Sequence, residues 1–129
     1  MLIALLYIAV VCTMWSEIAV GQEEGEKKSA GEWFLDGHQA LSANNYDKAL
    51  ECYRIAVTLD PSFANAYLFL GKMYMKKAME DEAFTAYKRA LSLRPDDAIV
   101  HLHLGEAYLS KGLVDAAVSE FRKTVAIDA

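Results

Sequence analysis

The stretches LFLGKMY, residues 68–74, and LHLGEAY, residues 102–108, are nearly the same phrase, set 34 residues apart. A weaker copy, FLDGHQA, occupies residues 34–40, at the same interval. Self-similarity at a fixed interval of this size is typical of proteins built from stacked copies of one supersecondary unit. The sequence therefore predicts a repeat architecture, whose register is set by three glycines, Gly37, Gly71 and Gly105.

Aligned on these glycines, the three copies also agree at positions that alternate between small and aromatic residues. These positions hold Ala49, Ala83 and Ala117, then Tyr53, Tyr87 and Phe121, then Ala56, Ala90 and Thr124. Within each copy, apolar residues recur every three or four positions, which is the period of an amphipathic helix. Small residues let two helices approach closely, and we expect the aromatic rings to fill the space beside them.

The joint pattern of small, aromatic and proline positions resembles the tetratricopeptide repeat over about residues 30–129. The resemblance implies an all-α fold, a right-handed α-solenoid of three helix-turn-helix repeats at residues 30–63, 64–97 and 98–129. Six helices are predicted, at about 31–43, 46–59, 64–77, 80–93, 98–111 and 114–127.

Turn residues support this division of the chain. Pro61 and Pro95 cannot continue a preceding helix but suit the first turn of a new one. Asn44 and Gly112 fall at the turn within a pair, where Asn or Gly most easily takes a left-handed backbone. Ala78 occupies the same place in the middle copy and departs from this pattern.

The N-terminal segment differs from the repeats in composition. Residues 1–16, MLIALLYIAVVCTMWS, carry no charged side chain. We expect residues 1–21 to form a hydrophobic helix that is either a signal peptide, cut after Gly21, or an uncleaved membrane anchor. Residues 22–29 are expected to be a polar linker. The protein is accordingly predicted to be exported, periplasmic or secreted, or anchored in a membrane.

The last predicted helix has no later helix to cover it. Its apolar residues are Val114, Val118, Val125 and Ile127. A repeat array normally ends in a helix with a polar outer face. We expect that the sequence is a fragment of a longer array; the alternatives are that this end meets a partner or forms a homodimer.

In the family, the first helix of each pair lines a concave groove, and the resemblance places contacts at the second, fifth, ninth and twelfth residues of each copy. Gly31 takes the second place of the first copy. The other positions form the candidate partner-binding site: Phe34, His38, Leu41, Asn65, Leu68, Lys72, Met75, Ile99, Leu102, Glu106 and Leu109. This largely apolar surface suits an extended or helical peptide. For Phe34 and Leu68, packing against neighbours is an equally favoured alternative.

One branch of the family holds the carboxylate of chaperone tails in a clamp of Lys, Asn and Arg. The corresponding places here hold Phe34, His38, Phe69, Ile99 and His103. None of the five matches, so a chaperone-tail adaptor is not expected.

Composition and motifs also limit the function. The net charge is −5, with 13 basic and 18 acidic residues, and the basic residues alternate with acids. Nonspecific nucleic-acid binding depends on clustered Lys and Arg, so it is not expected. Cys12 and Cys52 lie in such different settings that we expect no disulfide framework.

No residue cluster has the spacing of a metal site, a phosphate loop or a catalytic triad. His101 and His103 lie two residues apart on a predicted helix and point in different directions, so they cannot easily share a metal ion. His101 is interpreted as a core or interface histidine, because its place in the repeat is normally a bulky packing position. We therefore predict a non-enzymatic scaffold without cofactor or metal that binds a protein or peptide. The alternative is a structural module that self-associates or docks through its C-terminal repeat.

Overall fold

The computed structural model describes residues 3, 4, 7 and 26–128. Six helices follow one another: α2 (Ala30–Ser42), α3 (Tyr46–Leu59), α4 (Ala64–Lys76), α5 (Glu80–Leu93), α6 (Ala98–Ser110) and α7 (Val114–Asp128). The described residues contain no strand. The prediction of six helices in the repeat region is confirmed over residues 30–128, with each helix boundary within one residue of its predicted place.

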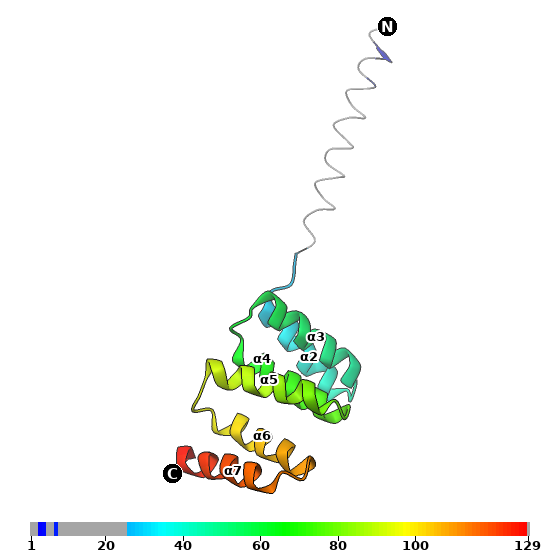
Figure 1. Cartoon of the computed structure of the whole chain (residues 1–129). Helices are drawn as coiled ribbons and strands as arrows, with labels where there is room; N and C mark the ends of the chain where they lie inside the picture. The colour runs from blue at the N-terminus through cyan, green and yellow to red at the C-terminus, as the bar shows by residue number, and fades with distance from the viewer. Residues whose placement is uncertain (1–2, 5–6, 8–25, 129) are drawn as a thin grey trace.

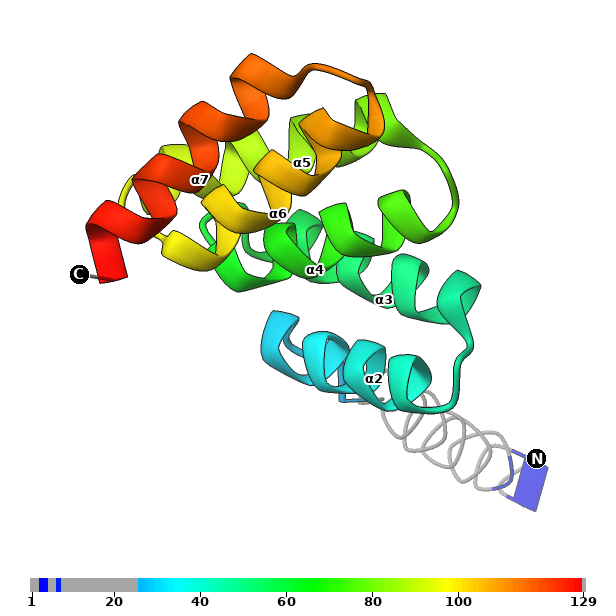
Figure 2. The same ribbon diagram turned by 90° about the horizontal axis from the view of Figure 1, so that it is seen from below.

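The helices form three pairs that are stacked one upon another (Figure 1). Each pair is joined by a tight turn, and the pair made of α4 and α5 lies between the other two. Along the stack α3 contacts α4 and α5 contacts α6, while α4 also contacts α6 directly. Figure 2 shows the same stack from below, from the end at which α6 and α7 lie.

Local sequence explains where helices begin. Ser29 and Glu32 form a reciprocal cap at the start of α2, in which the Glu32 carboxylate accepts a hydrogen bond of 2.7 Å from the Ser29 amide. The Asn45 side chain accepts from the Lys48 amide at the start of α3. At α6, the Asp97 carboxylate accepts from the Ile99 amide at 3.1 Å. These side chains satisfy amide groups that have no partner within a helix.

Close contact between paired helices depends on the glycines that set the register. A β-carbon added to Gly71 would lie 2.5 Å from the ring of Tyr87, which is 1% exposed. A β-carbon added to Gly37 would lie 2.6 Å from the ring of Tyr53. Because glycine has no side chain, each ring can lie against the backbone of the neighbouring helix. The predicted packing of small residues against aromatic ones is therefore confirmed.

The turns inside the pairs also agree with the sequence. Asn44, Ala78 and Gly112 all have positive φ, at 57°, 58° and 75°. Asn and Gly tolerate this left-handed conformation, whereas alanine adopts it at a cost.

The segment expected to be a signal or anchor, residues 1–21, lies outside the described residues except at positions 3, 4 and 7. Of the expected linker, only residues 26–29 are described. Within the described part of the chain, none of the helices combines the length and the apolar character that a membrane crossing requires.

Candidate functional site

The groove predicted from sequence is the surface formed by α2, α4 and α6. Its side chains come from helical positions three or four residues apart, which share one face of a helix. The α2 end, the α4 middle and the α6 end of this surface differ in chemistry.

An aromatic cluster occupies the α2 end of the groove. The rings of Phe34 and His38 lie 4.4 Å apart, and His38 lies 4.4 Å from Phe69 of α4. Phe63 packs 4.7 Å from Phe34, and Tyr53 lies beneath the cluster at 0% exposure. Phe34 and His38 are therefore half-buried and pack mainly against their neighbours.

A hydrogen bond fixes the His38 ring. The Tyr53 hydroxyl lies 2.9 Å from His38 Nδ1, and the carbonyl oxygen of Phe34 lies 3.2 Å from the same atom. Burial raises the pKa of Tyr53 to about 12, with the Cys52 thiol contributing, so the phenol keeps its proton at neutral pH. When Nδ1 carries no hydrogen it accepts from the phenol. The other ring nitrogen, Nε2, makes no hydrogen bond to the described residues.

The middle of the groove is cationic. Lys72 Nζ lies 4.9 Å from the centre of the Phe69 ring, and Lys76 Nζ lies 6.0 Å from that of Tyr46. Neither lysine forms an ion pair with a carboxylate in the described part of the chain. Asn65 differs, because its side-chain oxygen accepts a hydrogen bond of 3.0 Å from Arg94.

A cavity of about 510 Å³ lies between α4 and α6. It is lined by Lys72, Met75, Lys76, Tyr87, His103 and Glu106. Glu106 Oε2 lies 2.9 Å from His103 Nδ1, and the His103 ring stacks on Tyr87 with 6.2 Å between centres. Burial, and secondarily the Glu106 carboxylate, raise the pKa of Tyr87, which therefore stays neutral. This cavity thus has lysines on one side and the His103–Glu106 pair on the other.

The α6 end of the groove is apolar and open to solvent. Ile99 is 57% exposed, Leu102 39% and Leu109 48%. These three residues form an apolar stripe beside the α4–α6 cavity.

Leu68 requires a correction. It is 6% exposed and lies in the core with Phe84 and Tyr87, so it is not a groove contact. The reason is that α6 covers this part of α4, whereas no described helix covers the corresponding Leu102. Leu41 and Met75 are only partly exposed, because each packs against a core cluster.

Besides His103 and Tyr87, which line the α4–α6 cavity, two residues of α4 line the groove and were not among those predicted for it. Phe69 joins the aromatic cluster, and Lys76 adds the second positive charge of the cavity. Each follows a predicted contact, Leu68 and Met75, by one residue. The face of α4 that lines the groove is therefore rotated slightly from the predicted face. A prediction that also included the residue after each contact position would have found both Phe69 and Lys76.

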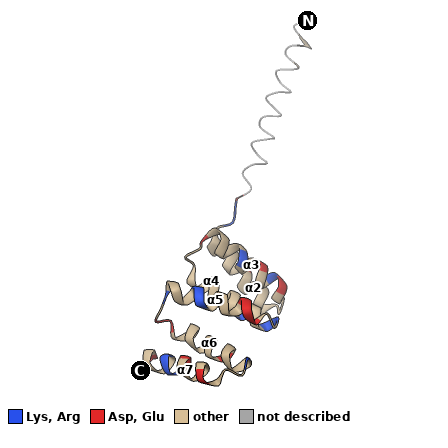
Figure 3. Cartoon of the chain, viewed as in Figure 1, with Lys and Arg blue, Asp and Glu red and all other residues tan. Residues whose placement is uncertain are grey.

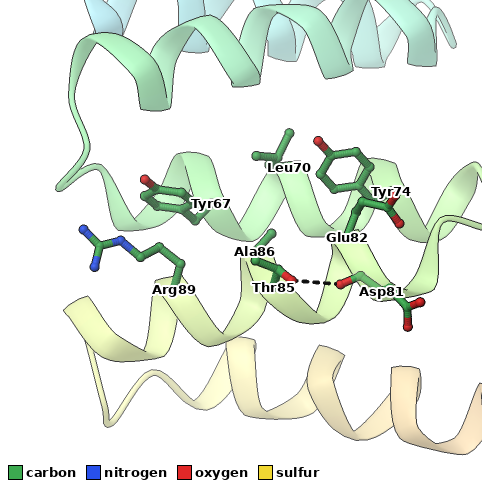
Figure 4. Close-up of a pocket in the computed structure, with 8 residues that line it drawn as sticks. All are labelled: Tyr67, Leu70, Tyr74, Asp81, Glu82, Thr85, Ala86 and Arg89. Carbon is green, nitrogen blue, oxygen red and sulfur yellow. Dashed lines mark hydrogen bonds between the residues drawn. The ribbon is translucent and has the colours of Figure 1, made fainter.

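A second cavity, of about 490 Å³, lies between α4 and α5 (Figure 4). Tyr67, Leu70 and Tyr74 enter it from α4, and Arg89 from α5 lies with its guanidinium 5.8 Å from the Tyr67 ring. The Thr85 hydroxyl donates to the Asp81 carbonyl, so it is engaged within α5. None of the predicted groove residues lines this cavity.

Charged residues of both signs are interspersed over the helices, as Figure 3 shows. In the described residues, no three His, Cys, Asp or Glu side chains are grouped so that they could hold a metal ion. His101 is buried and lies against Glu120, whereas His103 pairs with a different carboxylate, that of Glu106. The burial of His101 agrees with its interpretation as a core histidine.

Comparisons with known proteins agree on one family. A model described as TPR repeat matches residues 37–77 and 81–112, and a model described as tetratricopeptide repeat matches residues 98–129. No curated protein matches the chain significantly.

Solved structures are also similar to this chain. A crystal structure of MamA is 29% identical, with a TM-score of 0.74 over 78% of this chain. A MamA MSR-1 structure is 25% identical, with a TM-score of 0.71 over 78% of this chain. The chain spans 58% and 57% of the length of these two structures.

The second TPR of Spaghetti (RPAP3), bound to the HSP90 peptide SRMEEVD, has a TM-score of 0.74. The match covers 82% of this chain and 98% of that one, at 20% identity. At this identity the likeness concerns the fold alone.

Proposed function

The chain belongs to the tetratricopeptide repeat family, and we propose that it is a non-enzymatic scaffold whose groove binds a peptide or helix of a partner protein. The observation that carries this proposal is the exposed apolar stripe of Ile99, Leu102 and Leu109 beside the α4–α6 cavity. Apolar side chains exposed together on one face commonly mark a surface that binds another protein. In this proposal the three repeats form a right-handed solenoid that presents the groove on its concave side.

The charges of the groove indicate the chemistry of the partner. Lys72 and Lys76 have no carboxylate partner among the described residues, so an acidic side chain of a bound peptide would supply one. An apolar side chain of the same peptide would cover Leu102 and Leu109. The groove therefore favours a peptide that carries a carboxylate next to apolar residues.

Selection from a random peptide library against the full chain tests this proposal. We expect the selected peptides to combine acidic and apolar residues. Their binding should be weakened by Lys72→Glu, which repels the acid, and by Leu102→Glu, which places a charge on the apolar stripe. Leu102 is partly exposed, so its replacement should leave helical content unchanged by circular dichroism.

Matched controls carry the same changes outside the groove. Lys88→Glu alters an exposed lysine of α5, and Leu59→Glu alters a leucine of α3 that is 54% exposed. Both should bind selected peptides as the unaltered chain does. Peptides without acidic residues, or binding that resists both groove substitutions, would contradict the proposal.

We also propose that residues 1–21 direct export or anchor the chain in a membrane. The support for this is the uncharged apolar sequence of residues 1–16. Cell fractionation with N-terminal sequencing tests it. A mature chain that begins at Gln22 supports a cleaved signal, and an intact chain in the membrane fraction supports an anchor. An intact chain in the aqueous fraction contradicts both.

A further inference from the structure

The α4–α6 cavity contains a hydroxyl group that no other part of the described chain uses. Tyr87 is 1% exposed and lines the cavity, yet its hydroxyl forms no hydrogen bond within the described residues. Among the described side chains, no fully enclosed nitrogen or oxygen lacks a hydrogen-bond partner. The small exposed part of Tyr87 therefore includes its hydroxyl, which is open to the cavity. A buried phenol usually has a partner, so this group indicates a site for a ligand.

The corresponding tyrosine of the first repeat does have a partner. Tyr53 lies 34 residues before Tyr87, and its hydroxyl lies 2.9 Å from His38 Nδ1. In the middle repeat the place of His38 is taken by Lys72, which cannot accept a hydrogen bond and lies against the Phe69 ring. The first repeat thus satisfies its phenol with a neighbouring side chain, whereas the middle repeat leaves a donor unused.

Positive charge predominates among the groups that line the cavity. Lys72 and Lys76 form no ion pair with a carboxylate in the part of the chain that the structure describes. The contact of Lys72 with the Phe69 ring is a weak one at a partly exposed site. Among the lining residues the one carboxylate, that of Glu106, has 57% of its side chain exposed and lies against His103. A phenol and two ammonium groups all donate hydrogen bonds, so together they suit a carboxylate.

The lining residues become more buried from the entrance to the floor of the cavity. Lys76 is exposed, Lys72 is half-buried and Tyr87 is buried. A ligand therefore meets the lysines first and the phenol last. The cavity, at about 510 Å³, is large enough to admit a side chain. A carboxylate at the end of such a side chain can reach the floor while the main chain of the ligand stays in the groove.

We propose that the α4–α6 cavity binds the carboxylate of a glutamate or aspartate side chain of the partner, and that Tyr87 determines this specificity. The carboxylate accepts a hydrogen bond from the Tyr87 hydroxyl and pairs with Lys72, while Lys76 adds a second positive charge at the entrance. An uncharged amide forms weaker hydrogen bonds with the same groups. The inference rests on the proposed function for the identity of the partner, a peptide in the groove, but the site is tested without a peptide.

The probe is N-acetylglutamic acid α-amide, whose only charge is its side-chain carboxylate. Titrated into the isotope-labelled full chain, it should cause saturable NMR shifts at Lys72, Tyr87 and His103. N-acetylglutamine α-amide has the same shape without the charge and should bind about tenfold more weakly. N-acetylalanine carries its carboxylate at the end of a main chain and should bind no better than the glutamine probe.

Tyr87→Phe removes the hydroxyl alone and should weaken binding of the glutamate probe about tenfold. Tyr53→Phe is the same change in the first repeat and should leave binding unchanged. Urea unfolding separates a binding role from a structural one. Tyr87→Phe should be as stable as the unaltered chain, because the lost hydroxyl has no partner among the described residues. Tyr53→Phe should be less stable, because it loses the hydrogen bond with His38.

Four results would overturn the inference. They are the absence of saturable shifts at the three residues, unchanged binding by Tyr87→Phe, a clear loss of stability in that variant, and binding of N-acetylalanine equal to that of the glutamate probe. The last result would assign the cavity to the terminal carboxylate of a chain.

The peptide selection described above separates this inference from the proposed function. Selected peptides whose binding depends on Lys72 but not on Tyr87 would leave the proposed function in place and overturn the inference. Binding of the glutamate probe at Tyr87 without any selected peptide would contradict the proposed function and leave the carboxylate site in place.

Discussion

Glu120 Oε2 lies 2.6 Å from His101 Nδ1, and the two residues are 8% and 7% exposed between α6 and α7. The other nitrogen of the ring, Nε2, lies 2.8 Å from the carbonyl oxygen of Pro95. Both ring nitrogens thus face oxygen acceptors, and only the imidazolium form donates to both. Lys123 Nζ, at 3.0 Å from Glu120 Oε1, gives the carboxylate a cationic partner.

The other two repeats have no histidine and carboxylate at this place. The corresponding pair is Tyr67 and Ala86 in the middle repeat. We predict that Glu120→Ala lowers the free energy of unfolding by about 3 kcal/mol, because it leaves the His101 ring buried without its carboxylate. The double substitution His101→Tyr with Glu120→Ala copies the middle repeat and should recover more than half of this loss.

Urea unfolding followed by circular dichroism measures both values. Replacing both members of a buried ion pair with uncharged residues is often neutral or stabilising, whereas removing one is costly. A double variant no more stable than Glu120→Ala would show that this position does not accept the packing of the middle repeat.

The Glu120 pair also predicts a dependence on pH. Burial acts to raise the pKa of Glu120, but hydrogen bonds from His101 and Lys123 outweigh burial and hold the pKa below its ordinary value of 4.5. A carboxyl group whose pKa is lowered by folding stabilises the protein above its unfolded pKa, and this contribution is lost as the pH falls through the folded pKa. The free energy of unfolding should therefore rise with pH just below 4.5.

Glu120→Gln should show a smaller rise over the same range, because glutamine does not titrate. The pKa values of Glu32, Asp60 and Asp81 are also lowered, but these groups are present in both proteins and their contributions cancel in the difference. Urea unfolding at a series of pH values measures the difference. Parallel curves for the two proteins would contradict the predicted role of Glu120.

The sequence was sufficient for features that depend on residues close together in the chain or on the repeat itself. Gly71 and Tyr87 recur with the interval of 34 residues, so their contact in one repeat implied it in the others. The left-handed turns at Asn44 and Gly112 were predicted from their residue types, whereas Ala78, which departs from that pattern, adopts the same conformation although alanine disfavours it.

Features that depend on the neighbouring helix pair were harder to predict. Leu68 and Leu102 occupy the same place in their repeats, yet one is 6% exposed and the other 39%. The sequence of its own helix does not determine how exposed each leucine is. The exposed fraction depends on whether a described helix of the next pair covers it. The pairing of His101 with Glu120 was also not predicted, since 19 residues separate them and neither belongs to a recognised motif.

The contact of Gly71 with Tyr87 leads to a third prediction. A β-carbon at residue 71 would lie 2.5 Å from Tyr87 Cε1 and 2.7 Å from Cδ1, and the ring is too deeply buried to move freely. We predict that Gly71→Ala lowers the free energy of unfolding by about 1–3 kcal/mol through overpacking. This loss should appear although alanine is favoured over glycine in a helix by about 1 kcal/mol.

Gly31→Ala is the control for helix propensity. A β-carbon at residue 31 would have its nearest neighbour, Ser29 Oγ, at 3.9 Å, which is an ordinary contact. This variant should be at least as stable as the unaltered chain in urea unfolding. A Gly71→Ala variant as stable as the unaltered chain would contradict the prediction. It would mean that the Tyr87 ring shifts without cost and that close packing does not require glycine at residue 71.

The last prediction concerns the strained turn at Ala78. Its φ of 58° places the backbone of this residue in the left-handed conformation, which costs a non-glycine residue about 1–2 kcal/mol. Glycine removes this strain but loses more conformational entropy on folding. Ala78→Gly should therefore raise the free energy of unfolding by up to about 1 kcal/mol. Gly112→Ala is the reciprocal change in the next turn, where φ is 75° and no atom lies within 4 Å of an added β-carbon, so backbone strain alone should lower stability there. Urea unfolding of the two variants should give shifts of opposite sign, whereas two shifts of the same sign would show that the turn conformation does not determine their effect.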